Sequence, residues 1–205
     1  MPGLRERNKE RRRQEILSAA QDLFARQGYG ATAVSEIAAR ASVAEGTVFN
    51  HFPTKGDLLL ELMAHENTRV AQRLAAMKLA PDSDAREAIA AYFLVVTEES
   101  FALVDRATWR EVAALLVTAG QSPFALRYLE LRAALRRNLL VLLAELSANG
   151  RLPPDDHGAL ADLLWRAFWG LFQFLIASEN LQPADLHRSI ARDLDLIVPQ
   201  HGAKP

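Results

Sequence analysis

The sequence contains no cysteine, and this absence excludes disulfides, thiolate metal sites and thiol nucleophiles. It also contains no apolar run of the roughly 18 residues that a membrane-spanning helix requires. The N-terminus is polar and basic, whereas a secretory signal carries an apolar segment. We therefore expect a soluble, cytoplasmic protein without a membrane partner.

The sequence also lacks the usual marks of an enzyme. Its five histidines show no metal-ligand spacing, and His65–Glu66 is not followed by the second histidine of a zinc-protease helix. Glu98 and Glu99 are adjacent, so on a helix they point to different sides and cannot act as a catalytic pair. No glycine-rich phosphate loop is present. We expect no metal, no cofactor and no enzymatic activity, although an all-helical enzyme or ligand carrier is the less favoured alternative.

No segment alternates apolar and polar residues with the period of a strand. Apolar residues recur at helical spacing instead, which predicts an all-α protein of about nine helices. The first helix follows a basic cluster and ends at Gly28, and residues 1–8 and the segment after Pro199 are expected to be loose. The other helices are expected at about 34–40, 44–51, 56–79, 84–103, 107–118, 123–149, 156–179 and 183–198.

The formal net charge of the chain is only −1, but the charge is unevenly distributed. Residues 1–55 carry nine Lys or Arg and six Asp or Glu, a balance of +3, which leaves −4 for residues 56–205. This asymmetry suits a DNA-contacting module on a body that avoids DNA. We expect a DNA-binding domain at 1–55 and a regulatory core at 56–205. The basic cluster at residues 9–13 is either a solvated helix start or a phosphate contact.

Two short apolar-periodic segments, Val34–Arg40 and Ala44–His51, flank a tight turn at residues 41–43. Two short helices joined by such a turn match a helix-turn-helix, whose second helix enters the major groove of DNA. Phe49 is expected on the outer side of that second helix, among polar residues. An exposed phenylalanine in that setting suits a surface that meets another molecule.

The segment at 156–179 is apolar around most of its circumference when it is placed on a helical wheel. Such a helix is either the central helix of a monomeric bundle or a helix that meets both its own core and a second copy of the chain. We favour the second alternative, with Gly170 allowing close approach of the backbones. The expected dimer-interface residues are Phe168, Gly170, Leu171, Phe172, Leu175 and Leu194.

A set of residues between Arg13 and Leu59 has a further recognisable spacing. Its members are Arg13, Ile16, Leu17, Ala20, Leu23, Phe24, Gly28, Tyr29, Thr32, Val34, Ile37, Ala38, Ala41, Val43, Gly46, Thr47, Val48, Phe49, His51, Phe52, Pro53, Lys55, Leu58 and Leu59. This pattern resembles the N-terminal domain of the TetR family of transcriptional regulators. The remainder of the chain resembles that family only in its helical architecture. The resemblance implies a three-helix DNA-binding domain and a C-terminal helical core for ligand binding and dimerisation.

Three residues depart from the pattern of that family. Ser42 replaces the usual glycine, so the turn must form without glycine. Phe49 replaces the common tyrosine, which removes a hydroxyl that would bind phosphate. Glu45 is an acid on a surface that approaches phosphates, where it either accepts from a cytosine amino group or points aside.

The resemblance also implies roles for particular side chains. The residues expected at the DNA are Arg13, Ser35, Glu45, Gly46, Thr47, Phe49, Asn50, His51 and Lys55. Lys55 at a helix start combines a cation with free N–H donors and is expected to bind phosphate. His51 is expected to contact phosphate, and the alternative is a neutral packing residue at a helix end. A two-fold dimer of such domains requires a pseudo-palindromic operator in double-stranded DNA.

The helical core is expected to enclose a pocket for a small-molecule effector. The candidate lining residues are Met63, Asn67, Phe93, Val96, Phe101, Trp109, Phe124, Tyr128, Trp165 and Trp169, each of which could equally be a core residue. Their character suggests an apolar or amphipathic ligand that tilts the helix beginning at Lys55. The sequence thus predicts a repressor that a ligand releases from DNA. The alternative is a helical ligand-binding or interaction protein that has lost specific DNA binding, which Glu45 and Phe49 would favour.

Overall fold

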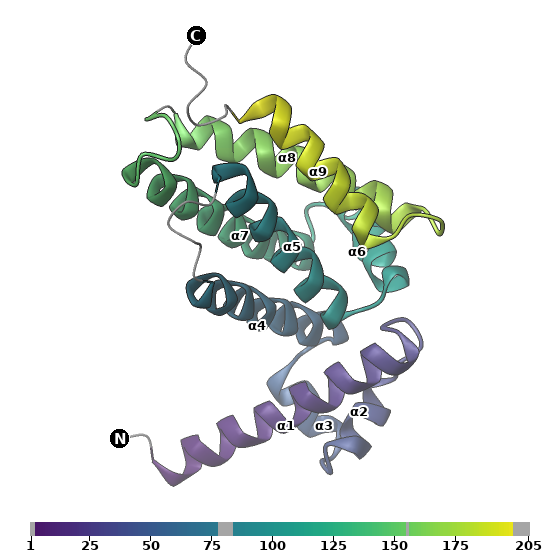
Figure 1. Cartoon of the computed structure of the whole chain (residues 1–205). Coiled ribbons are helices and arrows are strands. Elements are labelled where there is room, and N and C mark those ends of the chain that lie inside the picture. Colours follow the sequence, from purple (N-terminus) through teal and green to yellow (C-terminus); the bar gives the residue numbers. More distant parts are fainter. Residues whose placement is uncertain (1–2, 78–83, 155, 199–205) are drawn as a thin grey trace. The chain divides into compact units, whose positions relative to one another are not determined.

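The computed structural model describes residues 3–77, 84–154 and 156–198. Every regular element within these ranges is a helix, and there are nine of them, which confirms the all-α prediction (Figure 1). The helices are α1 Leu4–Gln27, α2 Val34–Arg40, α3 Glu45–His51, α4 Lys55–Ala76, α5 Ala85–Leu103, α6 Arg106–Thr118, α7 Pro123–Ala148, α8 His157–Ala177 and α9 Pro183–Ile197.

The observed helix boundaries agree with the expected ones to within a few residues, except at the N-terminus. There α1 begins at Leu4, so the expectation that residues 4–8 are loose is wrong. The extra residues include Arg5, Glu6 and Arg7, which are charged and have good helix propensity. Further along α1, Gln14 donates to Glu10 one turn away (2.7 Å). The expected chain break around residues 81–83 and the loose tail after Pro199 lie outside the described residues.

The chain forms two compact units. The first comprises residues 1–66 and 100–128, and the second comprises residues 67–99 and 129–205. This division differs from the expected boundary after residue 55. The reason lies in α6 and the start of α7, which contact the N-terminal helices: the amide of Tyr29 donates to Thr108, and the ring of Phe124 would lie 3.1 Å from a Cβ on Gly56.

In the first unit, α1 packs on α2, and α2 packs on α3 (Figure 1). The side chains between them are buried and apolar, as the periodicity predicted, and each of the larger ones contributes about 1.5–3 kcal/mol by leaving water. They include Ile16, Ala20, Phe24, Ile37, Val48 and Phe52. This core fixes how α3 is presented to solvent.

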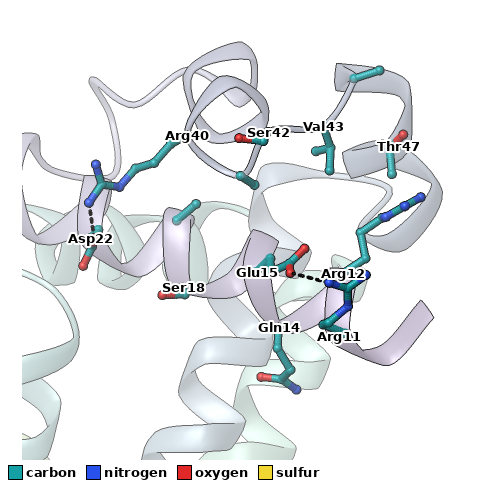
Figure 2. Close-up of a pocket in the computed structure, with 13 residues that line it drawn as sticks. Arg11, Arg12, Gln14, Glu15, Ser18, Asp22, Arg40, Ser42, Val43 and Thr47 are labelled. Atoms are coloured by element: carbon teal, nitrogen blue, oxygen red, sulfur yellow. Dashed lines mark hydrogen bonds and ion pairs between the residues drawn. The ribbon is translucent and has the colours of Figure 1, made fainter. Parts of the chain in front are cut away.

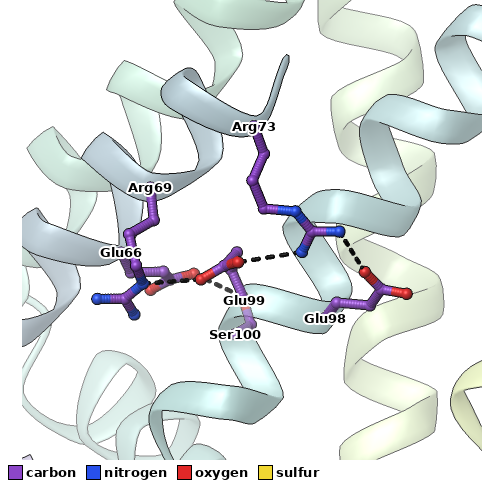
Figure 3. Close-up of polar contacts among 6 residues, drawn as sticks. All are labelled: Glu66, Arg69, Arg73, Glu98, Glu99 and Ser100. Atoms are coloured by element: carbon purple, nitrogen blue, oxygen red, sulfur yellow. Dashed lines mark hydrogen bonds and ion pairs between the residues drawn. The ribbon is translucent and has the colours of Figure 1, made fainter. Parts of the chain in front are cut away.

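In the second unit, α8 and α9 pack together, and aromatic side chains join α5 to α8. The rings of Phe93 and Phe168 stack with centroids 4.7 Å apart, and the hydroxyl of Tyr92 donates to the carbonyl of Leu135 in α7 (2.6 Å). Ion pairs connect α4 to α5, where Arg69 and Arg73 both bind Glu99 (Figure 3). The second unit is therefore held by an aromatic core and by charged pairs at its edge.

Helix α8 is, by length and composition, the one helix of the described residues that could cross a membrane. It has 21 residues and a mean hydropathy of 1.3, and 33% of its most apolar window is buried. The sequence analysis found no uninterrupted apolar run there because Asp162 and Arg166 break it. A core helix of a soluble protein has the same length and composition, so the feature by itself is weak evidence for a membrane span.

Candidate nucleic-acid interface

Helix α3 has one buried side and one open side. Val48 is fully buried and Phe52 follows it inward at the helix end. Glu45, Gly46 and Asn50 are exposed, and Phe49 keeps 43% of its surface in water. A short helix anchored by Val48 can therefore offer its other side to a partner without any change in the core.

The α2–α3 turn forms without glycine, as the sequence required. Ser42 adopts a φ of +56°, which costs a non-glycine residue about 1–2 kcal/mol. Two backbone hydrogen bonds offset this cost: the amide of Ser42 donates to Ala39 (3.1 Å), and the amide of Val43 donates to Ala38 (3.0 Å). The turn is therefore closed by the helix-end hydrogen bonds that a glycine would otherwise make easier.

A groove of about 970 Å³ runs between α1 and the α2–α3 turn (Figure 2). Its lining is mainly polar, and two of its arginines come from adjacent positions of α1. The lining residues are Arg11, Arg12, Gln14, Glu15, Ser18, Ala19, Asp22, Arg40, Ala41, Ser42, Val43, Ala44 and Thr47. The groove places α1 cations beside the start of α3.

The cations of this groove differ in whether they have partners. Arg40 binds the carboxylate of Asp22, and this bond holds the pKa of Asp22 below its usual value. Arg11 lies 3.8 Å from Glu15. Arg12 makes no ion pair or hydrogen bond with any part of the chain that the structure describes. Arg12 is therefore the groove cation best able to bind an incoming anion.

His51 lies at the end of α3 among cations from α1. Partial burial lowers its pKa from the ordinary value of about 6.5, and the charges of Lys9, Arg13 and Arg12 lower it further, while Glu10 opposes them. The imidazole is therefore neutral at neutral pH. An anion placed beside these cations would raise the pKa of His51 again.

Arg13 and Lys55, both expected at the DNA, are instead engaged within the first unit. Arg13 of α1 pairs with Glu61 of α4 at 2.8 Å, and its guanidinium lies 5.1 Å from the ring of Phe52. The hydrogen bond to Glu61 raises the pKa of Arg13. The register of α1 carries this information, because Arg13 precedes Ile16, Leu17 and Ala20 on the buried face.

Lys55 does not project toward solvent. Its Nζ donates to the carbonyl oxygens of Tyr29 (2.8 Å), Gly30 (3.3 Å) and Thr32 (3.1 Å), and lies 4.3 Å from the Tyr29 ring centroid. The ammonium thus ties the start of α4 to the loop between α1 and α2. Asp57 also lies at this helix start and accepts from the amide and hydroxyl of Thr54 (2.9 and 2.7 Å), and the phosphate contact of Lys55 stays a prediction.

The other expected DNA residues lie in the helix-turn-helix, on α2 and α3. Ser35 is exposed on α2, and Thr47 is half-buried and lines the groove. Glu45, Gly46, Phe49 and Asn50 share the open side of α3. Arg12 was not among the residues expected at the DNA. Its position next to the inward Arg13 places it on the outer side of α1, which was the signal for including it.

The sequence profile of the family described as bacterial regulatory proteins, tetR family, matches residues 16–62. This region of the chain is therefore similar to the DNA-binding domain of the TetR family. One relative, an HTH-type transcriptional repressor of Mycobacterium tuberculosis, is 46% identical over 59 residues, which are 29% of this chain and 31% of that protein. This chain thus spans less than a third of the length of that relative.

Two solved structures extend the similarity of fold to most of the chain. A putative transcriptional regulator from Saccharomonospora viridis, solved with choline, has a TM-score of 0.66 at 20% identity, over 92% of this chain and 98% of that one. RolR, solved with resorcinol, has a TM-score of 0.69 at 18% identity, over 97% and 92%. These likenesses confirm the fold class predicted for the C-terminal core.

The ten expected pocket residues are divided between the two units. Five belong to the first unit: Met63, Phe101, Trp109, Phe124 and Tyr128. Five belong to the second unit: Asn67, Phe93, Val96, Trp165 and Trp169. A cavity of about 430 Å³ in the second unit, between α4 and α7, is lined by none of them. The ligand site therefore stays a prediction.

Four of the six expected dimer residues are buried inside the chain's own second unit. Phe168, Phe172, Leu175 and Leu194 are at most 3% exposed, and Gly170 and Leu171 are half-buried. The aromatic side of α8 packs on α5 and α9 within the chain, and the dimer interface itself stays a prediction. Leu163 and Phe174, which are 43% and 70% exposed, flank Gly170 on the outer arc instead.

Proposed function

We propose that the protein is a homodimeric transcriptional regulator that represses its target by binding a pseudo-palindromic operator and that leaves the DNA when a small apolar or amphipathic ligand binds. The observation that supports this function most strongly is the open polar side of α3 beside the unpaired Arg12, within a segment that matches the tetR family. The names of the relatives support the same function.

In this proposal, the side chains of α3 read bases and the cations of α1 bind phosphates. Asn50 is the best candidate for a base contact, because its amide can pair with an adenine edge and it is exposed. Thr47 lies next to the groove, where its hydroxyl reaches phosphate. Glu45 disfavours phosphate and suits a cytosine amino group. Arg12 supplies sequence-independent affinity.

The outer arc of α8 supports dimerisation. Leu163, Gly170 and Phe174 follow one another at helical spacing, and a Cβ added at Gly170 would meet nothing within 4 Å in its own chain. On α9, Leu196 is 83% exposed. A second copy of the chain would cover these apolar side chains and would also supply the second recognition helix of a two-fold complex.

The effector is supported by the composition of the second unit. Phe93, Trp165 and Trp169 supply apolar and aromatic surface. The side-chain amide oxygen of Asn67, Oδ1, is buried without a hydrogen-bond partner in the described chain. A ligand with an apolar body and one donor would satisfy that oxygen. Among similar folds, one structure was solved with choline and another with resorcinol, both small molecules.

The test is the salt dependence of binding to a duplex from upstream of the protein's own gene. Fluorescence anisotropy should give an affinity that falls steeply with salt. Arg12→Ala should reduce the log–log slope by about 1 for each chain, that is about 2 for a dimer. Arg137→Ala, an exposed arginine of α7, is the matched control and should leave the slope unchanged.

A second function is supported by Glu45 and Phe49, which make α3 less suited to phosphates than the family pattern does. In this alternative the chain is a helical ligand-binding or interaction protein without specific DNA binding. Binding that is absent, or that does not respond to salt in the parent and in Arg12→Ala alike, would favour the alternative and contradict the regulator.

A further inference from the structure

The loop between α1 and α2, residues 28–33, determines where α2 and α3 lie, because it joins them to the long helix α1. Lys55 holds this loop from α4 by donating to three of its carbonyl oxygens. The loop also closes on itself: the hydroxyl of Thr32 donates to the carbonyl of Gly28 (2.7 Å). One lysine therefore binds three carbonyl oxygens of the loop, and Thr32 binds a fourth.

The amide side of the same loop is held by α6. The N–H of Tyr29 donates to the hydroxyl oxygen of Thr108 at 3.2 Å. Thr108 is 1% exposed, so water does not replace this bond. The Thr108 hydroxyl donates its single proton to Asp105 (2.6 Å), and a carboxylate can only accept. The hydroxyl oxygen is thus oriented to accept from Tyr29.

The glycines of the loop allow its backbone to approach α6 closely. Gly28 has a φ of +84°, and a Cβ on it would lie 3.6 Å from Asp105. A Cβ on Gly30 would lie 2.7 Å from the Glu111 carboxylate. Residues 105, 108 and 111 are spaced along one side of α6, so the loop lies along that side of the helix.

The first turns of α6 are themselves firmly placed. Trp109 is buried, and its indole N–H donates to the carbonyl of Ser100 at the end of α5 (3.1 Å). The hydroxyl of Ser100 donates to the buried carboxylate of Glu66 in α4 (2.7 Å; Figure 3). All these residues belong to the first unit. A displacement of α6 would therefore act on the loop directly.

We propose that Thr108 is a positioning residue that fastens the α1–α2 loop to α6, so that α6 and Lys55 independently set the placement of the recognition helix α3. The fastening itself is a property of the first unit. Its consequence for operator binding rests on the proposed function. A ligand that moves α6 would then change the DNA-binding surface without acting through the start of α4.

The first arm of the test is amide hydrogen exchange on the full-length protein without DNA. Thr108→Val keeps the shape of the side chain and removes the acceptor, so exchange of the Tyr29 amide should rise about 10-fold, with smaller increases across 31–38. Thr108→Ser should restore the parent rate. Thr118→Val, an exposed threonine of the same helix, should change neither region. Unchanged α8 exchange shows that the variants are folded.

Parent-like exchange of residues 28–38 in a folded Thr108→Val would overturn the fastening. If this variant does not fold, Thr108→Ala and Thr108→Ser decide, because only the serine restores the acceptor. Faster exchange in Ala but not in Ser supports the fastening, and equal exchange in both contradicts it.

The second arm measures operator affinity by anisotropy with the upstream duplex. Thr108→Val should weaken binding about 5-fold, and Thr108→Ser should bind like the parent. Equal affinity of Val and parent would overturn the link from α6 to α3. If no variant and no parent binds any duplex, the proposed function fails, whereas the exchange arm still decides the fastening.

Discussion

The outer side of α3 and the outer side of α8 both expose a phenylalanine, but in opposite surroundings. Phe49 of α3, 43% exposed, shares the open side of the helix with Glu45 and Asn50. Phe174 of α8, 70% exposed, lies on the arc of Leu163 and Gly170. A charged, polar surface suits a polyanion, whereas an apolar helix face suits a second protein surface.

The difference teaches that exposure of an apolar side chain does not by itself identify a partner. The residues around the exposed side chain indicate which kind of partner the surface suits. In the proposed account, α3 meets DNA and α8 meets a second copy of the chain. The two surfaces should therefore respond to different substitutions, and the following predictions are ordered from the largest expected effect to the smallest.

Phe174→Glu should break the α8 surface. A charge in an apolar interface is unpaired on dimerisation, so the dimer dissociation constant should rise about 100-fold, or about 2.7 kcal/mol. Sedimentation velocity over a dilution series measures this. Val117→Glu, on an exposed apolar residue of α6, should leave the dimer intact. A dimer that survives Phe174→Glu as well as it survives Val117→Glu would contradict the interface.

Lys55→Met tests whether Lys55 supports the DNA-binding surface from behind. The substitution removes three hydrogen bonds from a charged donor, and it should lower the free energy of unfolding by about 2 kcal/mol. Urea denaturation gives the value. Lys9→Met, which removes an exposed cation, should change it by less than about 0.5 kcal/mol. Equal free energies of unfolding for the two variants would show that the hydrogen bonds of Lys55 do not stabilise the fold.

Substitution of one glycine on each surface, α3 and α8, tests whether the two surfaces have different partners. Gly46 of α3 and Gly170 of α8 both have open space where a Cβ would lie. Alanine at either position should raise the stability by about 0.5 kcal/mol. Gly46→Ala should weaken operator binding about 10-fold and leave the dimer unchanged, because the methyl group faces the DNA. Gly170→Ala should weaken the dimer instead.

Anisotropy and sedimentation on both glycine variants separate the two roles. A loss of operator affinity in Gly170→Ala at concentrations where it is dimeric, or unaltered affinity in Gly46→Ala, would show that the surfaces have been assigned wrongly.

The smallest effect concerns pH. The pKa of His51 is lowered in the folded protein, so folding disfavours its protonation and the protein should lose stability as pH falls below about 6.5. Bound phosphate would raise that pKa, so operator affinity should rise about 3-fold between pH 7.5 and 5.5. His51→Gln should remove this rise. An identical pH profile in the variant would exclude His51 from the DNA contact.

The sequence predicted the helices and the helix-turn-helix well, because their apolar periodicity and capping are local. It also required a turn without glycine, and Ser42 forms one. It did not predict the partners of Arg13 and Lys55 within the chain, because residue type indicates a cation but not its partner. Glu61 and the carbonyl oxygens of residues 29–32 are distant in sequence, and only the fold brings them to these cations.

The proposed interface on α8 shows a second limit of sequence analysis. Two apolar arcs share this helix, and composition favours the aromatic one, Phe168 and Phe172, as the more distinctive. The fold uses that arc for its own core and leaves Leu163 and Phe174 exposed. Which arc faces inward depends on α5 and α9, so the helical wheel alone could not decide it.

The central claim is that two copies of α3 read a two-fold related sequence. Selection of bound duplexes from a randomised library, with the full-length protein, tests it most directly. The account predicts enrichment of a pseudo-palindrome whose half-sites face the same side of the duplex, and loss of that enrichment in Asn50→Ala and Gly46→Ala. Recovery of no preferred sequence, or of an asymmetric one that both variants still select, would contradict the account.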